Sequence, residues 1–103
     1  MKRLEQESNN IVAMDIYNEA MKEFHNGLYH SSFERLDYCQ AWVLYTDNYI
    51  LLKSYNTFIG AIEISTGTLV DVLRVVYGYT ATSAKHIAKF RHYYPITKEI
   101  TAR

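Results

Sequence analysis

The chain has 103 residues, enough for one hydrophobic core and too few for two. Hydrophobic residues make up 49% of it, yet no run approaches the roughly 20 apolar residues that a membrane helix needs. The formal net charge of zero is unusual for a dedicated nucleic-acid-binding protein. Cys39 is the single cysteine, so no internal disulfide forms, and we expect a cytoplasmic protein.

Charge is distributed unevenly along the chain. Residues 1–47 hold eight acidic and four basic side chains, which gives a net charge of −4. Residues 85–103 hold five basic side chains and one acidic side chain, which gives +4. Two interpretations follow: the two ends neutralise each other in the fold, or one of them meets a charged partner.

The first predicted element is a helix that is capped by Asn9 or Asn10 and ends before Gly27. Its apolar residues fill one broad face. The opposite side carries three acidic residues at a spacing of four, namely Asp15, Glu19 and Glu23. This row is either a solvated helix face or a surface that binds a basic partner.

A short helix is predicted next, followed by a sheet. Ser31 and Glu34 have the spacing of a capping box, which predicts helix near 32–38. Beyond Gln40 the chain becomes rich in Val, Ile, Leu, Tyr and Thr, with turn signals at Asp47-Asn48 and Thr66-Gly67. We predict four strands, at residues 41–46, 49–55, 57–64 and 68–76. Because the connections are short, the strands should form an antiparallel meander.

Three tyrosines of these strands are candidates for protein binding, because tyrosine is enriched at interfaces. They are Tyr45, Tyr49 and Tyr55. The alternative is that they pack in the core or in cross-strand pairs.

The last predicted element is a helix that is capped by Thr80 or Thr82 and stopped by Pro95. Its outer face should carry His86 and Tyr93 together with three residues that could bind nucleic acid or an acidic partner, namely Lys85, Lys89 and His92. Residues 1–95 should then form a single domain, and residues 96–103 a flexible tail.

These elements predict an α+β fold with an N-terminal helix, a four-stranded antiparallel sheet and a C-terminal helix packed on the sheet. The strands are apolar on both sides. Either helices therefore cover both faces of the sheet, or one face is left for a partner. An unpaired edge strand could also form a homodimer.

No catalytic, metal or cofactor motif is present. The histidines pair at separations of five and six residues, which do not place two ligands on one helix face. Ser83, near Lys85 and His86, is better explained as a residue of the first helical turn than as a nucleophile. We therefore expect no enzyme, no bound metal and no cofactor.

Two segments carry a family resemblance. "LLKSYNTFIGAI" and "GYTATSAKHIAKF" resemble a family of small phage and plasmid proteins of Gram-positive bacteria, which show an S-Y-x-T hairpin and a G-Y-[S/T]-x-T-[S/T]-x-K/R-H-I helix start. The match spans roughly 43–94. The long fourth predicted strand departs from the short hairpin of that family.

The resemblance implies a mobile-element protein that disables a host defence in the bacterial cytoplasm, most concretely an anti-CRISPR protein that binds type II-A Cas9 or its guide-RNA complex. Such an inhibitor needs no catalytic group. The alternative is a small accessory or regulatory protein that binds nucleic acid through the basic C-terminal helix.

Overall fold

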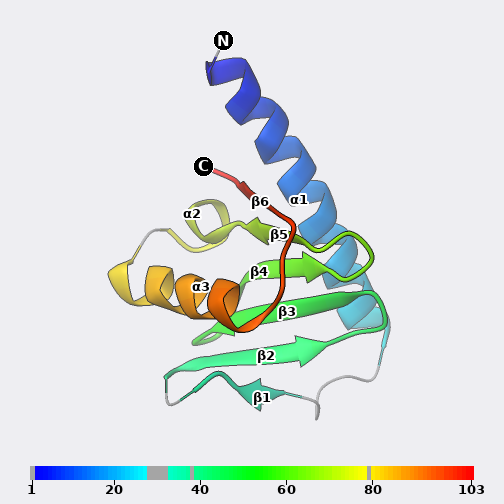
Figure 1. The fold of residues 1–103 in the computed structure, drawn as a ribbon, viewed down its shortest axis with the longest axis vertical. Coiled ribbons are helices and arrows are strands. Elements are labelled where there is room, and N and C mark those ends of the chain that lie inside the picture. The colour runs from blue at the N-terminus through cyan, green and yellow to red at the C-terminus, as the bar shows by residue number, and fades with distance from the viewer. Residues whose placement is uncertain (1, 28–32, 38, 79) are drawn as a thin grey trace.

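The computed structural model describes residues 2–27, 33–37, 39–78 and 80–103. The chain is α+β, with a long N-terminal helix, a mixed sheet and two further helices (Figure 1). The elements in chain order are α1 (Lys2–Asn26), β1 (Glu34–Arg35), β2 (Ala41–Tyr45), β3 (Tyr49–Ser54), β4 (Thr57–Glu63), β5 (Thr68–Asp71), α2 (Leu73–Val76), α3 (Ala81–Tyr93) and β6 (Lys98–Thr101).

The strands lie in the sheet in their sequence order, from β1 to β6. Neighbours from β1 to β5 run antiparallel, as the short connections require. β6 reaches the edge after a crossover through α2 and α3, and it pairs parallel to β5. The predicted four-stranded antiparallel meander is therefore the centre of a larger, mixed sheet.

Helices cover both faces of the sheet, which settles the choice left open by the strand pattern. Ile87 and Phe90 of α3 pack on the face that contains Val43 and Leu52. On the other face, three buried residues of α1 pack against alternate strand residues, namely Ala13, Ala20 and Phe24 against Leu44, Leu51, Ala61 and Val70. The apolar residues on both faces thus serve two cores.

α1 begins at Lys2, about two turns before the predicted cap. Its first half reaches past the strands that α1 crosses, toward the C-terminal end of the chain (Figure 1). Gln6 Nε2 donates to Thr101 O at 2.9 Å, and the Asn10 amide pairs with both Arg103 N and Arg103 O at 2.9 Å. Asn10 therefore lies inside the helix and binds the C-terminal strand segment instead of capping α1.

The predicted helix near 32–38 is wrong over the residues that the structure describes. Glu34 and Arg35 form β1, paired with Val43 and Trp42 of β2. Leu36, which follows them, is buried in the core under α3. Pairing with β2 thus outweighs the local capping signal, because it satisfies backbone groups and buries Leu36 at once.

The predicted fourth strand stops at Asp71, five residues early. The Asp71 carboxylate accepts a hydrogen bond from Leu73 N at 3.1 Å, and residues 73–76 form α2. Burial raises the pKa of Asp71 above its ordinary value, while that backbone hydrogen bond opposes the rise. The Asp71 carboxylate therefore bonds to the backbone at the start of α2, where the chain leaves the sheet and the crossover begins.

Residues 96–103, predicted as a flexible tail, contain β6. Ile100 and Ala102 are buried under α1. Thr97 N donates to Gly67 O at 2.8 Å, and Thr97 Oγ1 donates to Thr66 O at 2.6 Å. The segment is thus fixed by side-chain burial and by backbone pairing at its start.

Candidate functional site

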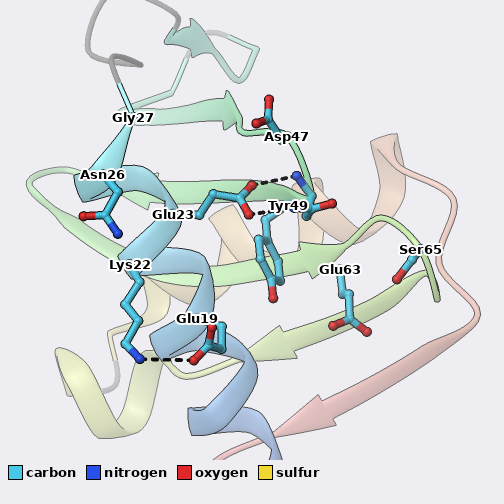
Figure 2. Close-up of a pocket in the computed structure, with 10 residues that line it drawn as sticks. Glu19, Lys22, Glu23, Asn26, Gly27, Asp47, Tyr49, Glu63 and Ser65 are labelled. Atoms are coloured by element: carbon cyan, nitrogen blue, oxygen red, sulfur yellow. Dashed lines mark hydrogen bonds and ion pairs between the residues drawn. The ribbon is translucent and has the colours of Figure 1, made fainter.

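A hollow of about 620 Å³ lies between the C-terminal half of α1 and one end of the sheet (Figure 2). Its charged residues are Glu19, Lys22, Glu23, Asp47 and Glu63, and we call it the acidic hollow. Four carboxylates and one ammonium group give it a net charge of −3. The remaining lining residues are Asn26, Gly27, Asn48, Tyr49 and Ser65.

Glu23 holds the β2–β3 turn that forms one wall of the hollow. Its Oε1 accepts from Asn48 N at 2.7 Å, and its Oε2 accepts from Asn48 Nδ2 at 2.8 Å. Burial tends to raise the pKa of Glu23, but hydrogen bonds from Thr46, Asn48 and Asp47 together hold it below its ordinary value. Glu23 is therefore ionised at neutral pH and already committed to a structural contact.

Glu19 and Glu63 present the more available carboxylates. Lys22 Nζ lies 3.3 Å from Glu19 Oε1, but both side chains are well exposed, so this ion pair holds Glu19 only weakly. Glu63 Oε1 accepts from Thr66 Oγ1 at 2.7 Å on the rim. The two carboxylates keep free lone pairs toward the hollow, where a cationic group would find acceptors from α1 and β4 together.

Tyr49 stands between these carboxylates, since it lies directly opposite Glu63 in the β3–β4 pairing. Burial raises the pKa of Tyr49, and the charges of Glu63, Glu23 and Glu19 raise it further. The phenol is therefore protonated at neutral pH, and its ring offers a negative face to a cation. Figure 2 shows the ring between Glu23 and Glu63.

The structure brings together only part of the predicted acidic row. Glu19 and Glu23 line the hollow. Asp15 is exposed one turn nearer the N-terminus of α1 and lies outside the hollow. Asp47 and Glu63 complete the site from a turn and from β4. Sequence reasoning missed these two, because only the β3–β4 register places Glu63 beside Tyr49.

The three predicted tyrosines do not form one surface. Tyr49 faces α1, but Tyr45 lies on the opposite face, where its ring centroid is 6.1 Å from that of Tyr94 in the α3 segment. Tyr55 sits in the β3–β4 turn with a φ of 54°. Only Tyr49 therefore contributes to the acidic hollow.

The predicted basic face of α3 is partly neutralised by ion pairs with acidic side chains. Lys89 Nζ forms an ion pair with Asp37 Oδ2 at 3.1 Å, which raises the pKa of Lys89 through their hydrogen bond. Arg91 forms a bidentate pair with Glu99 of β6. Lys85 and His92 are exposed, and neither has an ion pair within the described ranges. Lys89 of the predicted basic face and the neighbouring Arg91 thus hold α3 against the β1–β2 connection and β6.

His86, predicted on the outer face of α3, instead lies inside. It is 2% exposed, and its Nδ1 lies 2.7 Å from Ser54 Oγ, which in turn lies 3.0 Å from Ser83 Oγ. The helix begins after the Thr80 cap, whose Oγ1 accepts from Ser83 N, and burial of Ile87 and Phe90 turns residues 83 and 86 toward the sheet. Residues 83, 86, 87 and 90 then share the inner face at helical spacing.

The Ser54–Ser83–His86 cluster is not built for nucleophilic catalysis. Ser54 and Ser83 are both 0% exposed, so no substrate reaches either hydroxyl. No carboxylate orients His86 in the part of the chain that the structure describes. The cluster therefore serves as a satisfied polar contact between α3 and the sheet.

The described residues contain neither a metal site nor a membrane-spanning helix, and no known protein matches the chain. In those residues, no group of three or more His, Cys, Asp or Glu side chains is arranged to hold a metal ion. No helix formed by them is both long and apolar enough to cross a membrane. No family model, curated protein or solved structure matches the chain.

Proposed function

We propose that this protein is a non-enzymatic binding protein whose acidic hollow receives a basic segment of a partner protein. The observation that carries the proposal is the gathering of the Glu19, Glu23 and Glu63 carboxylates around Tyr49, in a hollow whose lining includes Asp47 and, as its one cation, Lys22. A lysine or arginine side chain entering the hollow would meet the Glu19 and Glu63 carboxylates and the tyrosine ring.

One wall of the hollow is preorganised for such a ligand. Because Glu23 and Asn48 hold the β2–β3 turn in place, little conformational entropy is lost when the ligand binds. The uncompensated negative charge accelerates encounter with a basic surface and disfavours acidic partners.

The finer proposal concerns the partner. The resemblance of "LLKSYNTFIGAI" and "GYTATSAKHIAKF" to phage and plasmid proteins supports a mobile-element inhibitor of a host defence, with type II-A Cas9 as the most concrete target. Cas9 holds nucleic acid in a positively charged channel, which is the kind of surface that an acidic hollow complements.

The binding mode is tested with a short fluorescent oligolysine peptide, followed by anisotropy. Replacing Glu19 and Glu63 together by Gln should weaken binding about fivefold, because two acceptors of the cation lose their charge. The matched control replaces Glu5 and Glu34, which are exposed outside the hollow. Equal weakening by both double variants would show that net charge, not the hollow, binds the peptide, and would refute the proposed mode.

The target is tested separately by a plasmid-interference assay in a strain with an active type II-A Cas9. Expression of the protein should let the targeted plasmid persist, and the Glu19→Gln/Glu63→Gln variant should restore interference. The Asp15→Asn variant tests the predicted helix row apart from the hollow. Because Asp15 lies outside the hollow, this variant should inhibit interference as the native protein does. Undiminished interference in the presence of the native protein would refute the Cas9 target while leaving the peptide result to decide the hollow.

A further inference from the structure

A row of alternating cationic and aromatic residues crosses four strands. The register pairs Arg35 of β1 with Trp42 of β2, Trp42 with Lys53 of β3, and Lys53 with Phe58 of β4. Directly paired residues project to the same face of a sheet. Phe58 contacts the Phe24 ring of α1 at a centroid distance of 4.9 Å, so the row lies on the α1 face. We call these four residues the cation–aromatic row.

The row borders a second hollow, of about 300 Å³, which is separate from the acidic one. It is lined by Phe33, Trp42, Lys53, Tyr55 and Asn56. Tyr55 is 41% exposed at its edge. Lys53 is four residues from Tyr49 along β3, so these two lining residues lie about 13 Å apart on the same face of the sheet.

The cations of the row are not neutralised by carboxylates. Lys53 Nζ lies over the rings of Phe33 and Phe58, at 5.2 Å and 5.9 Å from their centroids. Arg35 donates through Nε to Cys39 O at 2.9 Å. Within the described residues neither side chain forms an ion pair. The surface therefore carries two positive charges and four aromatic rings.

The alternation limits which ligand suits the surface. An apolar peptide would use the rings but would give the charges of Lys53 and Arg35 no anionic partner. A nucleic-acid duplex would use the cations, but its base faces are hidden in the stack. A single strand offers both groups at once, since its bases stack on aromatic rings while its phosphates pair with cations.

We infer that the cation–aromatic row, with Tyr55, is a binding surface for single-stranded nucleic acid. Bases stack on Trp42, and phosphates are held by Lys53 and Arg35. Tyr55 borders this surface at the β3–β4 turn, where its ring also lies 5.8 Å from that of His86. This function goes beyond the proposed binding of a basic protein segment and depends on other residues. It also moves the predicted nucleic-acid contact from α3, where Lys89 is engaged by Asp37, to the sheet.

The single tryptophan makes the test specific to the site. Trp42 is the only tryptophan in the chain, so its fluorescence reports on the row alone. Titration with a short oligothymidylate at low salt should quench this emission, and added salt should reverse the quenching. A duplex of the same length should leave the emission unchanged, because its bases are already stacked.

Variants decide which surface binds. Lys53→Gln should weaken oligothymidylate binding about fivefold, whereas Lys98→Gln, an equal charge change on β6, should have no effect. Tyr55→Asn should weaken binding about tenfold by removing the ring that borders this surface, and asparagine tolerates the positive φ at this position. Circular dichroism of each variant confirms folding.

Three outcomes would overturn the inference. The first is an unchanged Trp42 emission at low salt. The second is that Lys85→Gln loses binding while Lys53→Gln binds as the native protein does, which would place the contact on α3. The third is quenching by a proline-rich peptide and not by the oligonucleotide, which would assign the surface to a protein ligand.

Discussion

At the scale of single residues, His86 shows how one buried polar group joins a helix to the sheet. Its Nδ1 lies 2.7 Å from Ser54 Oγ, and its ring centroid lies 5.8 Å from that of Tyr55 in the β3–β4 turn. Burial lowers the pKa of His86, and the positive charge of Lys89 lowers it further. The folded protein therefore holds His86 in its neutral form.

This contact makes stability depend on pH. Above the ordinary histidine pKa of 6.5, His86 is neutral in both the folded and unfolded states and has no effect. As the pH falls below 6.5, the unfolded state takes up a proton that the folded state refuses. The free energy of unfolding should then fall, by at most about 1.4 kcal/mol per pH unit for one proton, until the pH passes the lowered pKa.

Urea unfolding between pH 7.5 and 5.5 measures this slope. His86→Gln should flatten it, whereas His92→Gln, at an exposed histidine of the same helix, should leave it unchanged. A slope that persists in His86→Gln would assign the dependence to other groups.

At the scale of elements, the N-terminal half of α1 and the β6 segment hold each other in place. The Asn10 amide forms two hydrogen bonds with the backbone of Arg103 and accepts a third from Gln6 Nε2 at 2.7 Å. An amide side chain thus pairs with the edge of the sheet as a strand would, and it satisfies backbone groups that a neighbouring strand would otherwise take.

Asn10→Ala should lower the free energy of unfolding by about 1 kcal/mol, because both backbone groups of Arg103 lose a partner. It should also speed amide hydrogen exchange in β6 selectively. Asn9→Ala is the matched control, since Asn9 is exposed on the same helix and gains the same helix propensity. Equal exchange rates in β6 for the two variants would argue against the contact.

The elements differ in how far sequence reveals them. The strands 41–46, 49–55 and 57–64 agree with β2, β3 and β4 to within one residue at each end, and the cap at Thr80 is confirmed. Each depends on local periodicity and turn chemistry. β1 and β6 contain only two and four residues, too few to show a periodic pattern, and β6 pairs with β5 only after the crossover through α2 and α3.

The candidate site could be predicted from the sequence only where local helix spacing defines it. The spacing of four between Glu19 and Glu23 places both on one face of α1, and both line the hollow. Glu63 and Lys53 were not found, because their roles depend on the strands that lie beside them. His86 was placed on the outer face, because the partner that its polar ring finds inside is Ser54 of β3, which is distant in sequence.

At the scale of the whole molecule, the two charged ends of the sequence meet only in part. Lys89 and Asp37 join the basic end to the acidic one. The carboxylates of the acidic hollow lie elsewhere, at the opposite end of β3 from Lys53. One face of a protein without net charge therefore carries an acidic and a cationic surface side by side. A complex of a basic protein with single-stranded nucleic acid would complement both proposed surfaces.

The contact between α1 and β6 has a consequence for how the chain is made. Gln6 and its partner Thr101 are 95 positions apart, so the contact cannot form until residue 101 has been synthesised. β2 to β4 can pair earlier, because their partners are close in sequence. We expect this hairpin sheet to fold first on the ribosome, and the first turns of α1 to become protected from proteolysis only after β6 has left the exit tunnel.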